Sequence, residues 1–187
     1  RQSLRADEHP VVPWANGRGV TEEVVSWPPG EEAFDWRVSV ATVTEPGPFS
    51  AYPGVDRVLV VASGGPLALA VDDAVLVAGR LDPLEFRGDA VTACVDAGGA
   101  ARVVNVMTRR GSAAAAVTVV EARAAGGTQP PSRVRVPEAG FAVAVVVRGT
   151  AAVGDDLLTA YDAVLTLDDL ELSGPATLVV ARIEPAR

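Results

Sequence analysis

Short runs in which apolar and polar residues alternate make up most of the chain, and valine dominates them. Alternation with a period of two is typical of β-strands that bury one face. Pro and Gly clusters separate the runs, and no segment sustains a 3.6-residue period. The pattern therefore predicts an all-β protein, a sandwich or a barrel. The predicted strands are Trp36–Val43, Val55–Ala62, Leu67–Val71, Val91–Val95, Ala101–Thr108, Ala116–Glu121, Phe141–Arg148, Ala163–Leu167 and Ala176–Ile183.

A weak internal repeat suggests that the chain contains two related halves. Three short segments recur in the same order at offsets of 85, 86 and 83 residues. A repeat this long favours two duplicated β-domains over a solenoid, the alternative being chance similarity between Val-rich strands. We expect the domains at residues 1–122 and 123–187, packed together as one compact unit. The matching pairs are Val58–Gly64 with Val143–Gly149, Asp82–Gly88 with Asp168–Gly174, and Asp72-Asp73 with Asp155-Asp156.

The composition then removes whole kinds of chemistry. All 16 basic residues are Arg, and the chain has one His (His9) and one Cys (Cys94). Schiff-base lysine catalysis and a Walker-type phosphate loop are excluded, as is a metal site built on several His or Cys ligands. The net charge of −8 argues against nucleic acid, and no apolar run is long enough for a membrane span. We expect a cytoplasmic protein with no metal, cofactor, nucleic-acid or membrane partner.

Arginines lie on the same strand faces as small polar residues. Arg37 and Ser39 share one face of their predicted strand, and Asn105 and Arg109 share one face of theirs. Arg57 lies on a third strand. One interpretation is that these arginines face solvent. The other is that they point into a small barrel, where their planar forks of donors match a small anionic ligand.

Two loops are further candidates for a site. The segment 13–22 contains Gly17-Arg18-Gly19, which can expose backbone N–H groups to an anion, although the sequence slightly favours a tight loop before a strand. The segment 46–57 is a rigid Pro- and Gly-rich connection that leads into the strand of Arg57.

Four motifs, spread over about residues 4–110, resemble the HutD/Ves family. They are Pro13-Trp14-x-Asn16-Gly17-x-Gly19-Val20-Thr21-x-Glu23, Phe34-Asp35-Trp36-Arg37-x-Ser39-x-Ala41, Gly47-Pro48-Phe49-Ser50-x-Tyr52-Pro53-Gly54-Val55-Asp56-Arg57 and Asn105-x-Met107-Thr108-Arg109-Arg110. The resemblance implies a bicupin, two cupin-type β-barrels. It also implies a link to histidine utilisation, with urocanate or a formylated or formiminated glutamate as ligand. The sequence departs from the family pattern at Ala15 and Arg18.

Many cupins hold a metal with His residues on the strands that flank the first turn. The corresponding stretch here, Pro53–Gly64, contains no His. We therefore expect the usual cupin metal site to be absent.

These observations lead to three functional hypotheses. The first is a metal-free protein that binds a small carboxylate metabolite in a regulatory or accessory role. The second is a cofactor-free isomerase, hydrolase or lyase with Glu22, Glu23 or Asp56 as general base. The third is an interaction module that serves a protein partner or a homodimer, which exposed Val-rich edge strands would motivate. The predicted ligand-binding residues are Asn16, Thr21, Trp36, Arg37, Ser39, Phe49, Ser50, Tyr52, Arg57, Asn105 and Arg109.

Overall fold

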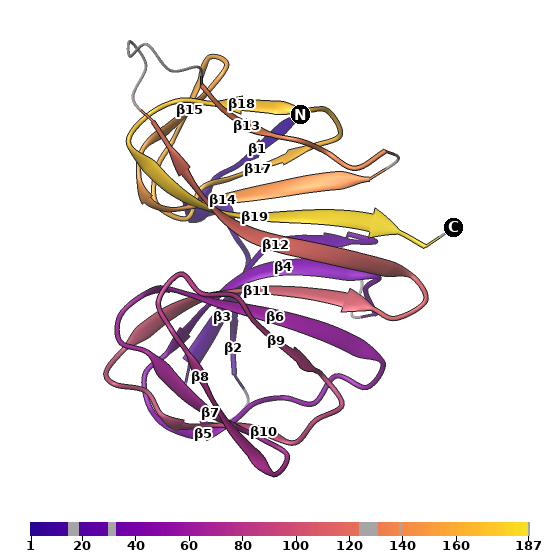
Figure 1. Cartoon of the computed structure of the whole chain (residues 1–187), viewed down its shortest axis with the longest axis vertical. Helices are drawn as coiled ribbons and strands as arrows, with labels where there is room; N and C mark the ends of the chain where they lie inside the picture. The colour runs from indigo at the N-terminus through magenta and orange to yellow at the C-terminus, as the bar shows by residue number, and fades with distance from the viewer. Residues whose placement is uncertain (15–18, 30–32, 124–130, 139, 187) are drawn as a thin grey trace. The chain divides into compact units, whose positions relative to one another are not determined.

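The computed structural model describes residues 1–14, 19–29, 33–123, 131–138 and 140–186, and strands make up most of them (Figure 1). The predicted all-β class is confirmed. In the described part of the chain the only helical element is the 3-10 turn η1 (Ala6–Glu8). No helix in these residues is long and apolar enough to cross a membrane.

The chain folds as two compact units. Unit 1 comprises Arg1–His9 and Ala114–Arg187, and unit 2 comprises Pro10–Ala113. This division differs from the predicted boundary, because the first nine residues belong with the C-terminal part of the chain. The reason is that β1 (Gln2–Leu4) pairs antiparallel with β17 (Ala163–Thr166), a contact far along the sequence that no local pattern reveals.

Unit 2 is a sandwich of two antiparallel sheets. Its six-stranded sheet has the order β2-β3-β4-β11-β6-β9, and its four-stranded sheet has the order β5-β10-β7-β8. Both sheets contribute to one apolar core, which includes Leu59 of β6, Leu67 and Leu69 of β7, and Val103 of β11. The strands are β2 (Val11–Pro13), β3 (Gly19–Trp27), β4 (Trp36–Val43), β5 (Gly47–Pro48), β6 (Val55–Ser63), β7 (Leu67–Val71), β8 (Ala74–Ala78), β9 (Leu84–Arg87), β10 (Thr92–Asp96) and β11 (Ala101–Arg109).

Unit 1 is built around a five-stranded sheet of order β1-β17-β14-β19-β12, with two smaller pairs, β13-β18 and β15-β16. Its core is made of Val, Ala and Leu side chains. Asp162 fixes the N-terminal segment to this unit: its carboxylate accepts hydrogen bonds from the Ala6 backbone N–H and the Arg5 guanidinium. The remaining strands are β12 (Ala113–Ala122), β13 (Ser132–Val134), β14 (Phe141–Gly149), β15 (Ala151–Val153), β16 (Asp156–Leu158), β18 (Leu170–Leu172) and β19 (Ala176–Pro185).

The two units share one strand order. The central strand β11 lies between β4 and β6 in unit 2, as β19 lies between β12 and β14 in unit 1. Strand β9 flanks β6 as β17 flanks β14, and β5 pairs with β10 as β13 pairs with β18. The sheets are open and do not close into barrels, so of the two predicted forms the structure has the sandwich. The shared order is consistent with the predicted duplication, which stays a prediction.

One sequence echo corresponds to equivalent strands. The segment Val58–Gly64 lies in and just after β6, and Val143–Gly149 lies in β14; both strands have a register shift near their ends. The glycines that end the two segments both have positive φ, +91° at Gly64 and +76° at Gly149. The similar segments 82–88 and 168–174 do not lie on equivalent strands. The first contains β9, which flanks β6, whereas the second contains β18, which pairs with β13.

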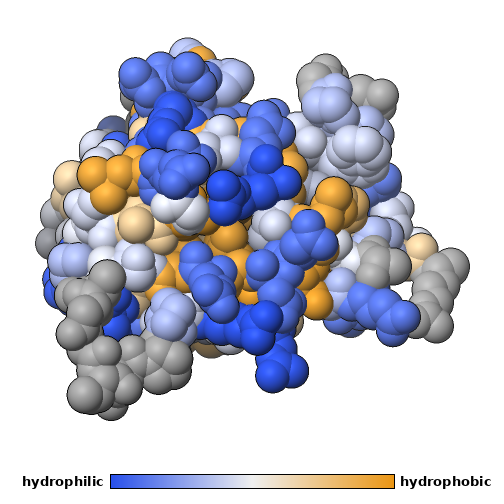
Figure 2. Space-filling model, turned by 90° about the horizontal axis from the view of Figure 1, so that it is seen from above, coloured by the Kyte–Doolittle hydropathy of each residue, from blue (hydrophilic) through white to orange (hydrophobic). Residues whose placement is uncertain are grey.

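Exposed apolar side chains gather at sheet edges. Val11 and Val12 on the edge strand β2 are 60% and 58% exposed, and Val75 and Val77 on the edge strand β8 are 67% and 64% exposed. On the face shown in Figure 2, hydrophobic patches are interspersed with hydrophilic residues. The Val-rich edges that motivate the homodimer hypothesis are therefore present in unit 2.

Candidate functional site

Unit 2 contains a cavity of about 250 Å³. Strands β4, β11 and β6 supply one wall, and the segment that connects β4 to β6 supplies another. Alternate residues on each strand face this space, as the period of two requires. The lining residues are Trp14, Thr21, Arg37, Ser39, Ala41, Val43, Pro48, Phe49, Ser50, Tyr52, Arg57, Val103, Asn105 and Met107.

The pairing register arranges the strand side chains in rows. Met107 of β11 lies opposite Arg37 of β4 on one side and opposite Arg57 of β6 on the other. The next row on this face brings Ser39 and Leu59 to either side of Asn105. The row beyond it consists of Ala41, Val103 and Val61. The cavity wall is therefore charged in the first row and becomes apolar where it meets the core.

Arg57 is a buried cation. Only 6% of the residue is exposed, and its Nη1 donates a hydrogen bond to the Ser50 carbonyl oxygen at 3.3 Å. The guanidinium carbon lies 4.9 Å from the ring centroid of Phe86 and 5.5 Å from those of Phe49 and Tyr52. Burial lowers the pKa of Arg57 to about 10, with Tyr52 opposing the shift and Arg37 adding to it. Arg57 remains charged at neutral pH.

Arg37 contacts the same aromatic group. Its Nη2 donates hydrogen bonds to the Tyr52 hydroxyl at 3.1 Å and to Sδ of Met107 at 3.3 Å. Its guanidinium carbon lies 4.4 Å from the Phe34 centroid and 5.3 Å from the Tyr52 centroid. Tyr52 therefore contacts both cations.

Neither cavity arginine has a carboxylate partner among the described residues. The buried Nε atoms of Arg37 and Arg57 also lack a hydrogen-bond partner in this part of the chain, as does Oδ1 of Asn105. Aromatic faces attract cations but do not neutralise them. The cavity wall is therefore positive and rich in hydrogen-bond donors, which suits an anionic ligand.

Backbone hydrogen bonds hold the connecting segment over the cavity. The N–H of Phe49 donates to the Thr92 carbonyl, and the N–H of Tyr52 donates to the Gly88 carbonyl, both at 2.8 Å. A Cβ at Gly88 would lie 2.6 Å from the carbonyl oxygen of Tyr52, so only glycine fits this close approach. The aromatic residues are thus fixed by the four-stranded sheet and its neighbouring turn.

Trp14 and Thr21 close another side of the cavity. Nε1 of Trp14 donates to the Thr21 hydroxyl at 2.8 Å, and the Trp14 ring packs edge-on against Phe49. Because the Thr21 hydroxyl accepts from Trp14, its own hydrogen is available to a ligand.

Most of the predicted binding residues line the cavity: Thr21, Arg37, Ser39, Phe49, Ser50, Tyr52, Arg57 and Asn105. Trp36 does not, because it precedes Arg37 on the strand and points to the opposite face, where it is 2% exposed. Arg109 does not either, because it lies beyond Met107 at the end of β11, where its Nε donates to the Phe34 carbonyl oxygen at 3.0 Å. Asn16, with the family departures Ala15 and Arg18, lies outside the described residues.

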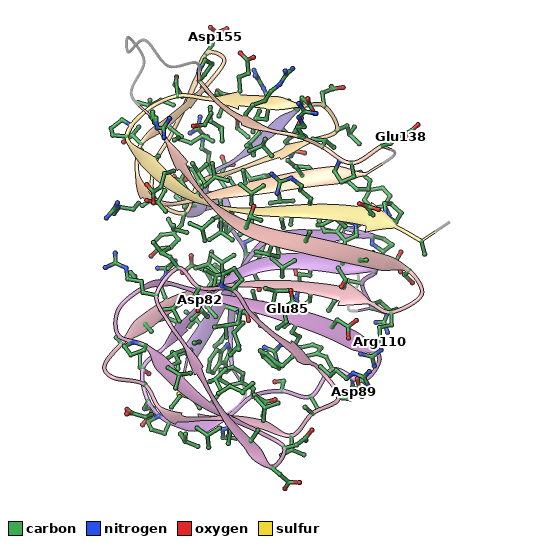
Figure 3. The ribbon with its side chains drawn as sticks, in the orientation of Figure 1. Asp82, Glu85, Asp89, Arg110, Glu138 and Asp155 are labelled. Atoms are coloured by element: carbon green, nitrogen blue, oxygen red, sulfur yellow. The ribbon has the colours of Figure 1, made fainter. Side chains whose placement is uncertain are left out.

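The three carboxylates proposed as general bases lie outside the cavity lining. Glu22 pairs with Arg102 at 2.8 Å, and Glu23 accepts a hydrogen bond from Ser26 at 2.8 Å. Asp56 pairs with Arg110 at 2.6 Å. Arg110 also pairs with Asp89, and Figure 3 shows these two residues together at one edge of unit 2. No described carboxylate is thus placed to remove a proton from a ligand in the cavity.

The described residues contain no group of three or more His, Cys, Asp or Glu side chains placed to hold a metal ion. Cys94 is buried in the core, and its thiol lies 3.4 Å from the Asp96 carbonyl oxygen. No His, Cys, Asp or Glu side chain is among the described residues that line the cavity, so none of them offers it a metal ligand.

Two residues behind the cavity wall were absent from the sequence-based site. Phe86 lies directly opposite Arg57 in the β6–β9 pair, and Phe34 packs against Arg37. Phe34 belongs to a quoted family motif, which was a usable signal. Phe86 had none, because its role depends on the register between two strands.

Comparison with known proteins decides the family. The HutD family model matches residues 6–181. The chain belongs to the HutD family. A HutD-family relative, Protein Ves of Citrobacter koseri, is 36% identical over 153 residues, which are 81% of this chain and 75% of the relative. An uncharacterised 21.2 kDa protein in the hutC 3′ region of Pseudomonas putida is 36% identical over 114 residues, which are 57% of each chain.

Solved structures support the HutD assignment and show the fold. HutD from Pseudomonas fluorescens SBW25, in a formate condition, has a TM-score of 0.81 and 26% identity, covering 100% of this chain and 99% of that one. A conserved protein of unknown function from Pseudomonas aeruginosa PAO1 has a TM-score of 0.83 and 24% identity, covering 98% of each chain. A cupin 2 conserved barrel domain protein from Leptotrichia buccalis has a TM-score of 0.58 at 9% identity, covering 98% and 96%. The fold is therefore cupin-like.

Proposed function

We propose that this chain binds a small carboxylate metabolite in the cavity of unit 2, through arginine rather than a metal ion. The observation that carries the proposal is the buried Arg57, 6% exposed and without a carboxylate partner among the described residues. A buried charge is costly unless something compensates it. A ligand carboxylate supplies that compensation and accepts charge-assisted hydrogen bonds.

The cavity size favours a small ligand. Its volume of about 250 Å³ lies below the roughly 300–1,000 Å³ of pockets that take drug-sized molecules. The lining combines two cations with neutral donors, Ser39, Asn105 and Tyr52, and with aromatic walls. This combination fits a planar or short-chain acid better than a large or cationic molecule.

The proposed setting is histidine utilisation, where the protein has a regulatory or accessory role. The support is membership of the HutD family and the relative named for its place in a hutC 3′ region. The candidate ligands are urocanate, formylglutamate and formiminoglutamate, all small carboxylates. The cavity offers no described carboxylate as a base, which favours binding over catalysis.

Isothermal titration calorimetry with these three acids tests the proposal. We expect at least one acid to bind, and Arg57→Gln to weaken it about tenfold or more, because a charge-assisted hydrogen bond contributes roughly 1.5–3 kcal/mol. Arg148→Gln is the matched control, since it removes the same charge from the surface of unit 1. Absence of both heat and thermal shift for every acid at millimolar concentration would refute the function.

We also propose that units 1 and 2 arose by duplication and that unit 2 alone serves as the binding unit. The support is their shared strand order and the different chemistry of their interiors. When β6 and β14 are aligned by their register shifts, Val61 corresponds to Val146. Arg57 of unit 2 therefore corresponds to Ala142 of unit 1. Arg182 lies opposite Ala142 in this row, at the position of Met107, but its guanidinium donates hydrogen bonds to the Arg135 carbonyl and the Thr118 hydroxyl, both at 2.9 Å.

A further inference from the structure

The two cavity arginines lie in one row of the sheet, two strands apart. Both are direct cross-strand partners of Met107, so their Cα atoms are separated by two strand spacings, about 10 Å. Their guanidinium carbons nevertheless approach the same Tyr52 ring, at 5.3 and 5.5 Å from its centroid. The two side chains therefore reach the same ring from the two strands that flank β11.

The charge on the cavity is unbalanced. Arg37 and Arg57 contribute two positive charges, and the described lining residues contribute no negative one. The two cations also oppose each other, because Arg37 is one cause of the lowered pKa of Arg57. A ligand with a single negative charge balances one guanidinium and leaves the other uncompensated.

The neutral groups nearby do not supply the missing charge. The Tyr52 hydroxyl accepts a hydrogen bond from Arg37 and keeps its own hydrogen to donate. Asn105 and Ser39, in the next row, are also neutral. Each guanidinium presents several donors in a plane that matches one carboxylate. Two such forks, both in contact with Tyr52, offer places for two carboxylates.

We propose that the cavity selects dicarboxylates, with one carboxylate on Arg37 and the other on Arg57. This inference rests on the proposed anion-binding function and narrows its ligand class. Among the candidate ligands it favours the glutamate derivatives, which carry two carboxylates, over urocanate, which carries one. Arg37 is then the residue that determines specificity, because Arg57 alone suffices for a monocarboxylate.

The test compares glutarate with pentanoate, which has the same five-carbon chain and one carboxylate. Calorimetric titrations of the full chain are run at one pH and one ionic strength. We expect glutarate to bind about tenfold tighter or more, the effect of one further charge-assisted contact. Inorganic phosphate, a compact anion, is the third probe and is expected to bind more weakly than glutarate, because the proposal places the two negative charges on separate carboxylates.

Substitutions of Arg37 test whether this residue binds the second carboxylate. In Arg37→Gln the preference for glutarate should fall to less than about threefold, whereas Arg148→Gln should keep the full preference. Arg37→Lys keeps the charge but loses the planar fork, and should retain part of the preference. Circular dichroism establishes that each variant is folded, and the comparison of ligands on the unmodified chain does not depend on any variant.

The outcomes separate this inference from the function beneath it. If neither acid binds at millimolar concentration, and the three pathway acids do not bind either, anion binding itself fails. Equal affinity for glutarate and pentanoate overturns dicarboxylate selection and leaves anion binding standing. Phosphate binding as tightly as glutarate also overturns it, in favour of a compact dianion. A full preference in Arg37→Gln overturns the role of Arg37.

Discussion

The cavity arginines are supported by aromatic rings where many buried arginines have carboxylates. Phe86 packs against Arg57 and Phe34 against Arg37, and Tyr52 contacts both cations. A ring fixes the position of a guanidinium without consuming its charge. The arrangement keeps both charges available to a ligand, and the free protein bears the cost of burying them.

That cost predicts a trade-off between stability and binding at Arg57. Burial lowers the pKa of Arg57 well below its ordinary value, to about 10, and each pKa unit corresponds to about 1.4 kcal/mol, so the charge costs on the order of 3 kcal/mol. Ring contacts return part of this. We expect Arg57→Met to raise the free energy of unfolding by about 1–2 kcal/mol in urea titrations, while acid binding falls tenfold or more. A less stable variant would contradict the expectation.

The pH dependence of binding checks the same charge. The folded-state pKa of Arg57 is about 10, below the unfolded value, so the unfolded state binds more protons between the two values. The stability penalty is therefore complete below about pH 10 and is relieved as the pH rises through that window. Anion binding should change in the opposite sense, with a constant affinity from about pH 7 to 9 and a loss above about 10. Calorimetry at constant ionic strength measures it; an affinity unchanged above that pH would exclude Arg57 as the anchor.

Phe86 should act on binding without touching the ligand, because it contacts Arg57 from outside the cavity lining. Phe86→Leu keeps an apolar side chain but removes the ring. A cation–π contact contributes roughly 0.5–2 kcal/mol, so acid affinity should fall by about three- to tenfold. Phe86→Tyr retains the ring and should bind the acid about as tightly as the unmodified chain. If both variants lose affinity in proportion to their loss of thermal stability, the role of Phe86 is only structural.

At the scale of strands, the alternation of apolar and polar residues predicted the features that depend only on local sequence. It located β4 and β7 and placed Arg37, Ser39 and Asn105 on faces that now line one cavity. It missed β3, because a register shift between Glu23 and Val25 breaks the period of two within that strand. The position of Phe86 depends on pairing between separate strands, which no local pattern contains.

Gly64, which directly follows β6, should tolerate substitution far less well than Gly99, which has open space around it. At Gly64, φ is +91° and an added Cβ would lie 2.2 Å from the Ala100 carbonyl oxygen. At Gly99, φ is +109° and nothing lies within 4 Å of that position. Left-handed strain costs about 1–2 kcal/mol at either residue, and the clash adds to it only at Gly64. Urea denaturation should show a larger loss for Gly64→Ala than for Gly99→Ala; equal losses would mean that the backbone relaxes around the added carbon.

At the scale of the whole chain, two units of one strand order have different interiors. When the strands of the two units are aligned by their register shifts, Ala142 of unit 1 occupies the position of Arg57 in unit 2. Val180 of unit 1 occupies the position of Asn105. The core of unit 1 consists of Val, Ala and Leu side chains, and the Arg182 that lies opposite Ala142 donates its hydrogen bonds to the Arg135 carbonyl and the Thr118 hydroxyl. The same topology thus supports a packed core in one unit and a ligand cavity in the other.

This asymmetry predicts where a ligand protects the chain from hydrogen exchange. A ligand that binds only the folded state stabilises it by about 2.7 kcal/mol at one hundred times its dissociation constant. With glutarate as the probe, amides of β4, β6 and β11 in unit 2 should exchange more slowly, because these strands form the cavity wall. Amides of the equivalent strands β14 and β19 in unit 1 serve as the internal control and should exchange at an unchanged rate. Arg57→Met should abolish the protection in unit 2, which shows that it comes from the ligand rather than from added salt. Protection confined to unit 1, or equal in both units, would place the binding site outside the cavity described above.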